Sequence, residues 1–411
     1  MPEHPTDRFR RLLVSEPARA LAYDAMVMAL GTNELERSLA AAFRACVLAP
    51  ADHRLRKNLL FLLQRSDRWD EMSAWIPRHR RPLPARETHP VDLAQVQSRY
   101  RWLMDQLDSK RSEEAWTPSA VENWKRVFTM DSRHLANFRR SELSSGTQTP
   151  PDRPAAFPSL EFTHLYPELS EEERVAYTPG LRRMFLTLFN RLYRAGCPEV
   201  DWYDAAALDD GRFGARLLEL DGVGPVTAKS IQSAYYACRV ASLVPKGGVV
   251  MEIGGGFGAV ASRMMAIRPD ITYVLTDLPL NMMLTYTYLS SLFGDAVAGL
   301  WEDGDRPAPG HRALVVPPWR LAELPLQVDL AVNTMSFQHM DERNHAFYGE
   351  AMRKLGTRRL YHLNRNAFKR PPGQDTMVVP AEQYSFMADY ETVESDGFDG
   401  QWIEVIAKAR T

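Results

Sequence analysis

Hydrophobic positions divide the chain into a helical part and a later part of short apolar runs. The clearest helical stripe follows Ser170 and Glu173, which have the spacing of a capping box. Apolar residues then recur on one helix face, at Leu181, Met184, Phe185, Leu188, Phe189 and Leu192. Further helices are expected over residues 17–30, 33–48 and 54–64, and from about Asp67. We therefore expect residues 1 to about 240 to be almost entirely helical.

Two proline-rich segments interrupt this helical part. Residues 77–89 combine proline with arginine, and residues 141–158 combine it with serine and threonine. Such composition is typical of connectors between folded elements. We therefore expect a helical hairpin region over residues 1–90. A second helical region, over residues 91–240, is expected to cover the substrate side of a site.

From Gly247 onward, short β-branched runs alternate with helical segments. The predicted strands lie within residues 247–256, 271–279, 313–318, 328–335, 358–364 and 402–409. A strand, helix, strand repetition is typical of a parallel sheet with helices on both faces. The pattern therefore predicts an α/β fold, a Rossmann-like doubly wound sheet over residues 241–411. The last of these strands is expected to form an antiparallel hairpin at the edge.

Composition narrows the function classes. The 411 residues carry 50 Lys and Arg against 52 Asp and Glu, a net charge of −2, which argues against a protein whose main partner is nucleic acid or an anionic membrane. Cys46, Cys197 and Cys238 stand too far apart for a CxxC zinc site, and no dense Asp and His cluster calls for a metal. No apolar run is long enough to span a membrane and no secretory signal is evident, so we expect a cytoplasmic protein.

The segment that carries chemistry is the glycine turn after the first predicted strand. A turn without side chains lets a cofactor approach the backbone closely. Gly254, Gly256 and Ala259 fit the dinucleotide fingerprint GxGxxA, with Asp277 as the acid that binds a ribose. This interpretation predicts an NAD-dependent oxidoreductase.

The same turn also fits ExGxGxG, the first motif of S-adenosylmethionine methyltransferases. Glu252 stands two residues before Gly254, where an acid can order the turn and the methionine end of the cofactor. NAD enzymes rarely place a charge inside that strand. Too few residues follow the turn for a sheet and a separate catalytic domain. Asp277, 23 residues after Gly254, suits the ribose in either interpretation. The methyltransferase interpretation is therefore favoured.

Four segments resemble a known family: EIGGGFGAVASRM from Glu252, YVLTDLPLNMMLTYTYLSSLFGD from Tyr273, VDLAVNTMSFQHM from Val328 and YHLNRN from Tyr361. They are similar to the bacterial sugar O-methyltransferase family, over about residues 215–410. The resemblance implies a class I methyltransferase fold, S-adenosylmethionine as the cofactor, and a sugar or glycosylated small molecule as the acceptor. His339 departs from the family, which usually has glutamate at this place.

The resemblance also implies a set of site residues. The cofactor site is expected to contain Glu252, Gly254, Gly255, Gly256, Gly258, Asp277, Leu278, Trp319 and Asn333. Trp319 follows the third strand of the methyltransferase fold, where adenine often packs, although it suits a core position equally well. Asn333 ends the fourth strand and is expected to line the pocket. A homodimer contact through the helical part is a further expectation.

Methyl transfer to a sugar hydroxyl requires a base, because that hydroxyl is a very weak acid. His339 is the first candidate, since it follows the fourth strand on the ligand-bearing edge of the sheet. Asp341 is a second candidate, and Asn364 is expected to orient the acceptor. Structural alternatives remain open: His339 suits a capping position at a helix start, and Asp341 suits a first-turn acid.

One motif favours a different class of protein. Residues 217–231, LLELDGVGPVTAKSI, resemble the helix-hairpin-helix motif of DNA-repair proteins, in which hairpin amides bind a backbone phosphate. Lys229 would assist that contact. The negative net charge and the single copy of the motif argue against DNA binding, which stays open as an alternative beside the NAD-dependent oxidoreductase.

Overall fold

The computed structural model describes residues 34–49, 52–75, 89–110, 135–140, 169–197, 211–302, 304–366, 380–398 and 402–410, with Val27, Trp202, Ala205 and Ala206. The helix expected over 17–30 and the connectors expected over 77–89 and 141–158 lie almost wholly outside these residues.

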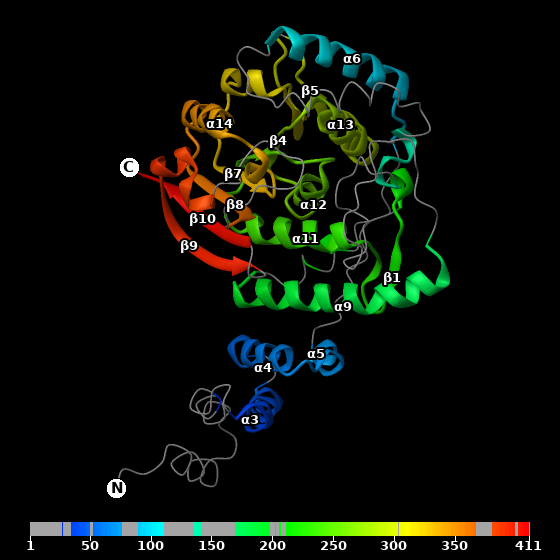
Figure 1. Ribbon diagram of the computed structural model, residues 1–411, viewed down its shortest axis with the longest axis vertical. Helices are drawn as coiled ribbons and strands as arrows, with labels where there is room; N and C mark the ends of the chain where they lie inside the picture. Colours follow the sequence, from blue (N-terminus) through cyan, green and yellow to red (C-terminus); the bar gives the residue numbers. More distant parts are fainter. Residues whose placement is uncertain are drawn as a thin grey trace.

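An eight-stranded sheet lies at the centre of the described residues (Figure 1). Its strands, in spatial order, are β5 (Val297–Gly299), β6 (Ala313–Val315), β4 (Thr272–Thr276), β3 (Val249–Ile253), β7 (Leu330–Thr334), β8 (Arg359–Arg365), β10 (Trp402–Ala409) and β9 (Tyr390–Phe398). The first six are parallel, and β10 runs antiparallel to both of its neighbours. The predicted doubly wound sheet with an antiparallel edge hairpin is confirmed. The strand order reverses direction between β3 and β7.

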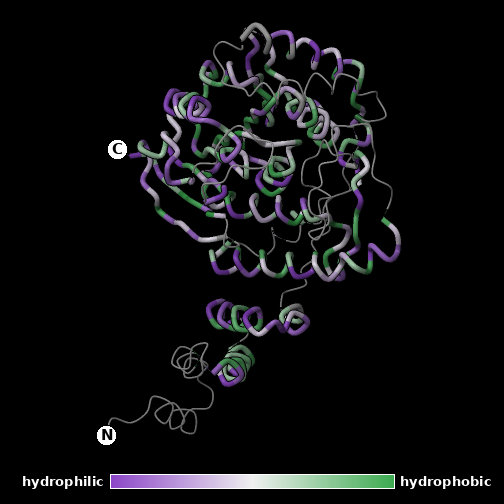
Figure 2. The backbone as a smooth tube through the Cα atoms, in the orientation of Figure 1, coloured by the Kyte–Doolittle hydropathy of each residue, from purple (hydrophilic) through white to green (hydrophobic). Residues whose placement is uncertain are grey.

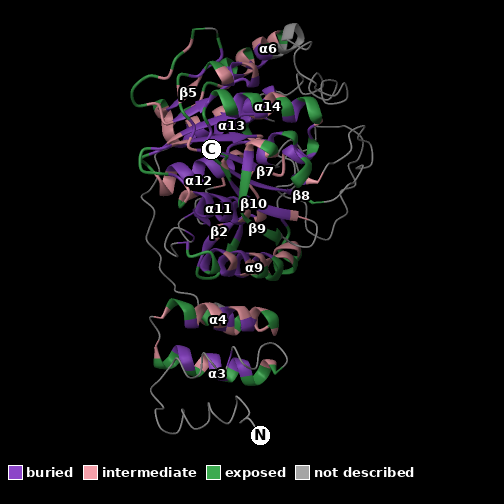
Figure 3. Cartoon of the chain, turned by 90° about the vertical axis from the view of Figure 1, so that its left-hand side faces the viewer, coloured by how far each residue is buried: buried purple, intermediate pink, exposed green. Residues whose placement is uncertain are grey.

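The inner strands of the sheet are buried on both faces, because helices cover each of them. On one face α9 (Glu171–Arg194), α11 (Ala228–Ala241), α12 (Ala259–Ile267) and α13 (Pro279–Phe293) share a core with alternate residues of the strands, such as Val250 and Tyr361. On the other face α14 (Glu342–Lys354) packs on the intervening residues, such as Met251 and Leu360. Buried residues therefore concentrate in the inner strands and in α11 (Figure 3), whereas hydrophilic segments lie along the outside of the molecule (Figure 2).

The helices of the N-terminal part lie at two opposite ends of the molecule. The first three are α3 (Leu35–Leu48), α4 (His53–Arg65) and α5 (Trp69–Trp75), and they follow one another beyond α9 (Figures 1 and 3). Asn190 on α9 donates to Gln64 on α4 at 2.6 Å, which joins the two helices. The fourth helix, α6 (Leu93–Lys110), packs at the other end against α13. Residues 1–90 and 91–240 stay predicted regions, since no boundary between them is tested.

The helix of the predicted capping box is formed as expected. Ser170 accepts from the Glu173 N–H at 3.1 Å, and the Glu173 carboxylate accepts from the Ser170 N–H at 3.0 Å. Five of the six residues in the predicted stripe are buried, and Met184 is half-buried. The buried residues of the stripe belong to a core that also contains residues of α4 and of the strands.

The expectation of an almost entirely helical N-terminal part is wrong in one segment. Leu218–Leu220 (β1) and Gly224–Val226 (β2) form a small antiparallel hairpin, and Thr227 then caps α11 by accepting from the Ser230 N–H at 3.0 Å. Gly222, with φ of 76°, makes the turn. A helix-hairpin-helix motif requires a helix where the strand β1 lies. The prediction of that motif is therefore wrong.

A buried carboxylate joins α9 and α11 to the edge hairpin. Glu404 on β10 is 4% exposed and accepts from the hydroxyls of Tyr235 and Tyr361 at 2.8 Å each. Arg191 on α9 donates to the same carboxylate at 3.2 Å. Because three elements share this one group, the helical part and the sheet are connected by buried charge as well as by apolar packing.

None of the helices among the described residues combines the length and the apolar run that crossing a bilayer requires.

Candidate functional site

The predicted glycine turn lies at the carboxyl edge of the sheet, where the strand order reverses. In open α/β sheets this is the place where ligands bind. Gly254 donates its N–H to the carbonyl of Thr276 at 2.8 Å, which ties the turn to the end of β4. Gly254, Gly256 and Gly258 have φ of 76°, 60° and 85°, in the left-handed region that favours glycine. The turn then leads into α12 with Gly258 as its N-cap.

Two of these glycines differ in what surrounds them. A Cβ atom at Gly254 would lie 2.0 Å from Oγ of Ser336, so the loop after β7 lies directly against the turn. A Cβ atom at Gly256 would meet no atom of the described residues within 4 Å. The turn is therefore closed by the protein at Gly254 and open at Gly256.

Asp277 lies one residue after β4 and faces the turn. Its Oδ2 accepts from the Gly256 N–H at 2.7 Å, and its Oδ1 accepts from the Leu278 N–H at 2.6 Å and from Asn281 at 2.9 Å. Burial raises the pKa of Asp277, while these hydrogen bonds lower it. The structure thus places Asp277 against the glycine turn, with Leu278 bonded to it, and contact of either residue with a cofactor stays a prediction.

Glu252 lies in β3 directly behind the turn and is fully buried. Its Oε2 accepts from the Tyr273 hydroxyl at 3.0 Å, whereas Oε1 has no hydrogen-bond partner among the described residues. A Cβ atom at Gly255 would lie 3.1 Å from Oε2. Burial raises the pKa of Glu252 to about 7, although the Tyr273 hydrogen bond and the charge of Lys229 oppose the shift. One carboxylate oxygen is therefore held and the other is left for a further donor.

Aromatic residues from the N-terminal part support the turn from another side. Phe257 in the turn packs on Phe138, with ring centres 5.7 Å apart, and on Tyr288 of α13 at 5.1 Å. The buried guanidinium of Arg139 lies 5.3 Å from the centre of the Phe257 ring. Sequence reasoning missed Phe138 and Arg139, because no motif marks a segment that reaches the turn only in the folded chain.

Asn333 connects three strand ends at the same edge. Its Nδ2 donates to the carbonyl of Ile253 at 2.7 Å. Its Oδ1 accepts from the Phe337 N–H at 3.1 Å and from Asn364 at 3.0 Å. The fully buried side chain thus uses its hydrogen-bonding groups inside the protein. The structure gives Asn333 a role in shaping the site, and direct contact with a cofactor stays a prediction.

Asn364 and His339 are joined through Gln338. Asn364 Oδ1 accepts from the Gln338 N–H at 3.2 Å, and Gln338 Nε2 lies 3.1 Å from His339 Nε2. His339 ends the short 3-10 turn Phe337–His339, and its side chain is exposed. Met335, just before this turn, has φ of 62°, an uncommon conformation for a residue with a side chain. The loop after β7 is thus held in a specific shape.

The other two predicted residues lie at the same edge in less direct positions. Asp341 caps α14, since its Oδ1 accepts from the Asn344 N–H at 3.0 Å. The sequence left open a first-turn acid, and the structure places Asp341 just before the first turn, as the N-cap. Trp319 lies in the 3-10 segment Pro318–Glu323 after β6 and is half-buried. All the predicted site residues therefore follow, or lie within, strands whose ends meet at one edge.

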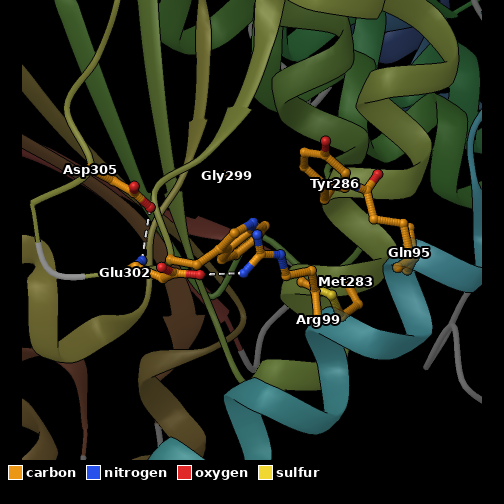
Figure 4. Close-up of a pocket in the computed structure, with 9 residues that line it drawn as sticks. Gln95, Arg99, Met283, Tyr286, Gly299, Glu302 and Asp305 are labelled. Carbon is orange, nitrogen blue, oxygen red and sulfur yellow. Dashed lines mark hydrogen bonds and ion pairs between the residues drawn. The ribbon is translucent and has the colours of Figure 1, made fainter.

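A separate cavity of about 280 Å³ lies between α6, α13 and the end of β5 (Figure 4). Its lining residues are Gln95, Val96, Arg99, Met283, Tyr286, Gly299, Trp301, Glu302 and Asp305. Arg99 spans it to form an ion pair with Glu302 at 2.6 Å. None of the predicted site residues lines this cavity. Across the described part of the chain, no group of three or more His, Cys, Asp or Glu side chains has the arrangement of a metal site.

No family model matches the chain, and no curated protein matches it. Solved structures match at low identity. LaPhzM is 16% identical over 44% of this chain and 57% of that chain, little more than half its length, with a TM-score of 0.29. Magnesium protoporphyrin IX methyltransferase (ChlM) from Synechocystis PCC 6803, with bound SAH, is 12% identical over 44% of this chain and 82% of that chain, with a TM-score of 0.32. The pyocyanin biosynthetic protein PhzM is 11% identical over 98% of each chain, with a TM-score of 0.35.

Proposed function

We propose that this protein is an S-adenosylmethionine-dependent O-methyltransferase that acts on a hydroxyl of a sugar or of a glycosylated small molecule. The observation that carries the proposal is a glycine turn with a buried acid on each side. Among the described residues, Gly256 faces open space and one oxygen of Glu252, behind the turn, has no partner. The Asp277 carboxylate accepts the Gly256 N–H. A carboxylate inside the first strand favours this cofactor over a nicotinamide dinucleotide.

The residues at the turn fit the proposed cofactor. Asp277 would accept from ribose hydroxyls beside the Gly256 opening. The unpartnered Oε1 of Glu252 suits a positively charged donor such as the amino group of the methionine moiety. Trp319 is proposed to pack against adenine. When bound, S-adenosylmethionine would supply a methyl group activated by its positively charged sulfur.

The protein has two tasks beyond binding: it must place the acceptor hydroxyl and take its proton. His339 is proposed as the base, because its exposed ring stands on the loop that lies against the turn. Asn333 and Asn364 hold that loop on the ends of β3 and β8. Asp341 is proposed to act indirectly, by fixing where α14 begins after the loop.

Calorimetry with S-adenosylhomocysteine and with NAD⁺ separates the two cofactor classes. We expect S-adenosylhomocysteine to bind and NAD⁺ to give no heat. The Asp277→Asn variant serves as the control that the binding occurs at the turn, because it keeps the volume of the side chain and removes its charge. Binding of NAD⁺ without S-adenosylhomocysteine would favour the oxidoreductase interpretation and end the present proposal.

The His339→Ala variant tests the proposed base. Transfer of a labelled methyl group to glycosylated hydroxyl acceptors should fall by about 10²–10⁴-fold, the usual contribution of a general base. Affinity for S-adenosylhomocysteine should stay unchanged. Amine acceptors without hydroxyl groups are run in parallel, since methylation of these alone would contradict O-methylation. Turnover within about twofold of the unaltered protein would remove His339 from the base role.

A further inference from the structure

The amide residues Asn333, Asn364 and Gln338 connect β3 to His339 through hydrogen bonds, and the backbone N–H of Gln338 makes the link to Asn364. Asn333 donates to the Ile253 carbonyl at 2.7 Å, and Asn364 donates to Asn333 Oδ1 at 3.0 Å. Asn364 Oδ1 in turn accepts from the Gln338 N–H at 3.2 Å. All three amides are buried, at 4% exposure or less. The connection therefore starts at the glycine-turn strand and ends on the loop that carries His339.

Backbone groups determine which way the last amide points. Gln338 Oε1 accepts from the Arg365 N–H at 2.9 Å. Reversing the amide would set its NH₂ group against that N–H, two donors facing one another. The Gln338 amide nitrogen therefore faces His339, with its Nε2 3.1 Å from the ring Nε2. Since an amide nitrogen can only donate, the ring Nε2 must accept.

We infer that Gln338 is a positioning residue that holds the neutral His339 ring in the tautomer with its proton on Nδ1, so that Nε2 carries the lone pair. In imidazole the protonation of one nitrogen follows from the hydrogen bond that the other makes. The inference rests, for its catalytic meaning, on the proposed base role of His339. In that role, the proton of the acceptor hydroxyl passes to Nε2.

The Gln338 amide N–H occupies the place that an acceptor hydroxyl takes when it donates to Nε2. Both are single donors directed at the same lone pair, so the acceptor must replace the amide before the proton can move. When Nε2 is protonated, it becomes a donor and loses its bond with Gln338. Gln338 therefore selects the base-competent tautomer and gives way to the acceptor.

The Gln338→Glu variant tests this inference with little change of shape. A glutamate keeps an acceptor oxygen for the Arg365 N–H but presents an acceptor to the ring in place of a donor. We expect the His339 proton to move to Nε2. Nuclear magnetic resonance of ¹³C,¹⁵N-histidine-labelled protein at alkaline pH reports the tautomer, and the His339→Gln variant assigns the signal by its loss.

Gln327→Glu provides the matched control for the change of charge. Gln327 precedes β7 at the opposite edge of the sheet, where it accepts from Arg358 at 3.1 Å on the exposed surface. The control should leave the His339 tautomer as it is. A ring with its proton on Nε2 in the unaltered protein, or a tautomer that Gln338→Glu does not change, would overturn the inference.

Kinetics connects the tautomer to the reaction. Gln338→Glu should lower kcat by at least about tenfold, since a catalytic histidine in the wrong tautomer can lose up to about 10⁴-fold. The KM for S-adenosylmethionine should stay unchanged, because the amide faces the loop and not the glycine turn. The spectra decide the inference about Gln338 without any turnover. Failure of His339→Ala to reduce turnover instead counts against the proposed base role.

Discussion

Because Ser336 lies so close to Gly254, adding one methyl group at Gly254 should strongly destabilise the fold. The contribution of the contact can be separated from that of the backbone. In Gly254→Ala the new Cβ atom would lie 2.0 Å from Oγ and 2.3 Å from Cβ of Ser336. A left-handed backbone costs a residue with a side chain about 1–2 kcal/mol. Overpacking adds about 1–3 kcal/mol. We expect Gly254→Ala to lower the free energy of unfolding by about 2–5 kcal/mol.

Gly256→Ala isolates the backbone part of this effect. Gly256 also has a positive φ, of 60°, but in the part of the chain that the structure describes a Cβ atom there meets nothing within 4 Å. Its cost in stability should therefore be only the backbone part, about 1–2 kcal/mol. The same variant should nevertheless impair binding of S-adenosylhomocysteine, because the methyl group enters the open side of the turn.

The double variant Gly254→Ala, Ser336→Gly isolates the contact. Removing the Ser336 side chain takes away the two atoms that the new methyl group would overlap, and leaves only an ordinary contact with Asn333 at 3.7 Å. The midpoint of urea denaturation, followed by tryptophan fluorescence, should recover part of the loss in the double variant. Equal destabilisation by Gly254→Ala and Gly256→Ala, or a double variant no more stable than Gly254→Ala alone, would contradict the expected overlap with Ser336.

Three further predictions concern the groups around the turn. Burial raises the pKa of Glu252 to about 7 from its ordinary value of 4.5, so the folded protein holds this proton longer than the unfolded chain. Stability should therefore fall as pH rises from 4.5 to 7, by up to about 1.4 kcal/mol per pH unit, and urea titrations of Glu252→Gln should lack this component. Asp277→Asn should weaken the binding of S-adenosylhomocysteine by about 10–100-fold, as measured by calorimetry, because a hydrogen bond to a charged group contributes about that much. Arg139→Met should lower the thermal midpoint and the affinity for S-adenosylhomocysteine, because it removes the cation that lies on Phe257. The exposed Arg101→Met should change neither quantity.

The parts of the sheet that could be predicted are those whose signal is local. β3, β4, β6 and β7 are buried on both faces, so their residues form apolar runs that stand out from their surroundings. β9 could not be found in this way. Residues 391–397 are all exposed and mostly polar, and the strand exists because it pairs with β10. Its signal lies in the partner strand and not in its own residues.

The same distinction between local and long-range signals applies to the residues of the candidate site. Glu252, the glycines and Asp277 could be located because a strand, a turn and the next strand end lie close in sequence and recur at known spacing. The contact of Arg139 with Phe257 joins segments more than a hundred residues apart, and no local pattern announces it. Cofactor contact of Asn333 stays a prediction, whereas its hydrogen bonds with Ile253 and Asn364 were not foreseen. Residue type predicts that such a group will form hydrogen bonds, whereas only the fold determines with what.

The position of Glu404 late in the chain affects how the protein folds during its synthesis. Arg191, the partner of Glu404, precedes it by 213 residues. At translation rates of 5–20 residues per second, α9 leaves the ribosome roughly 10–40 s before β10 arrives. In that interval Arg191 and Tyr235 lack the anion that they share in the finished molecule. The helices α9 and α11 can therefore form their hydrogen bonds with Glu404 only after β10 has been synthesised.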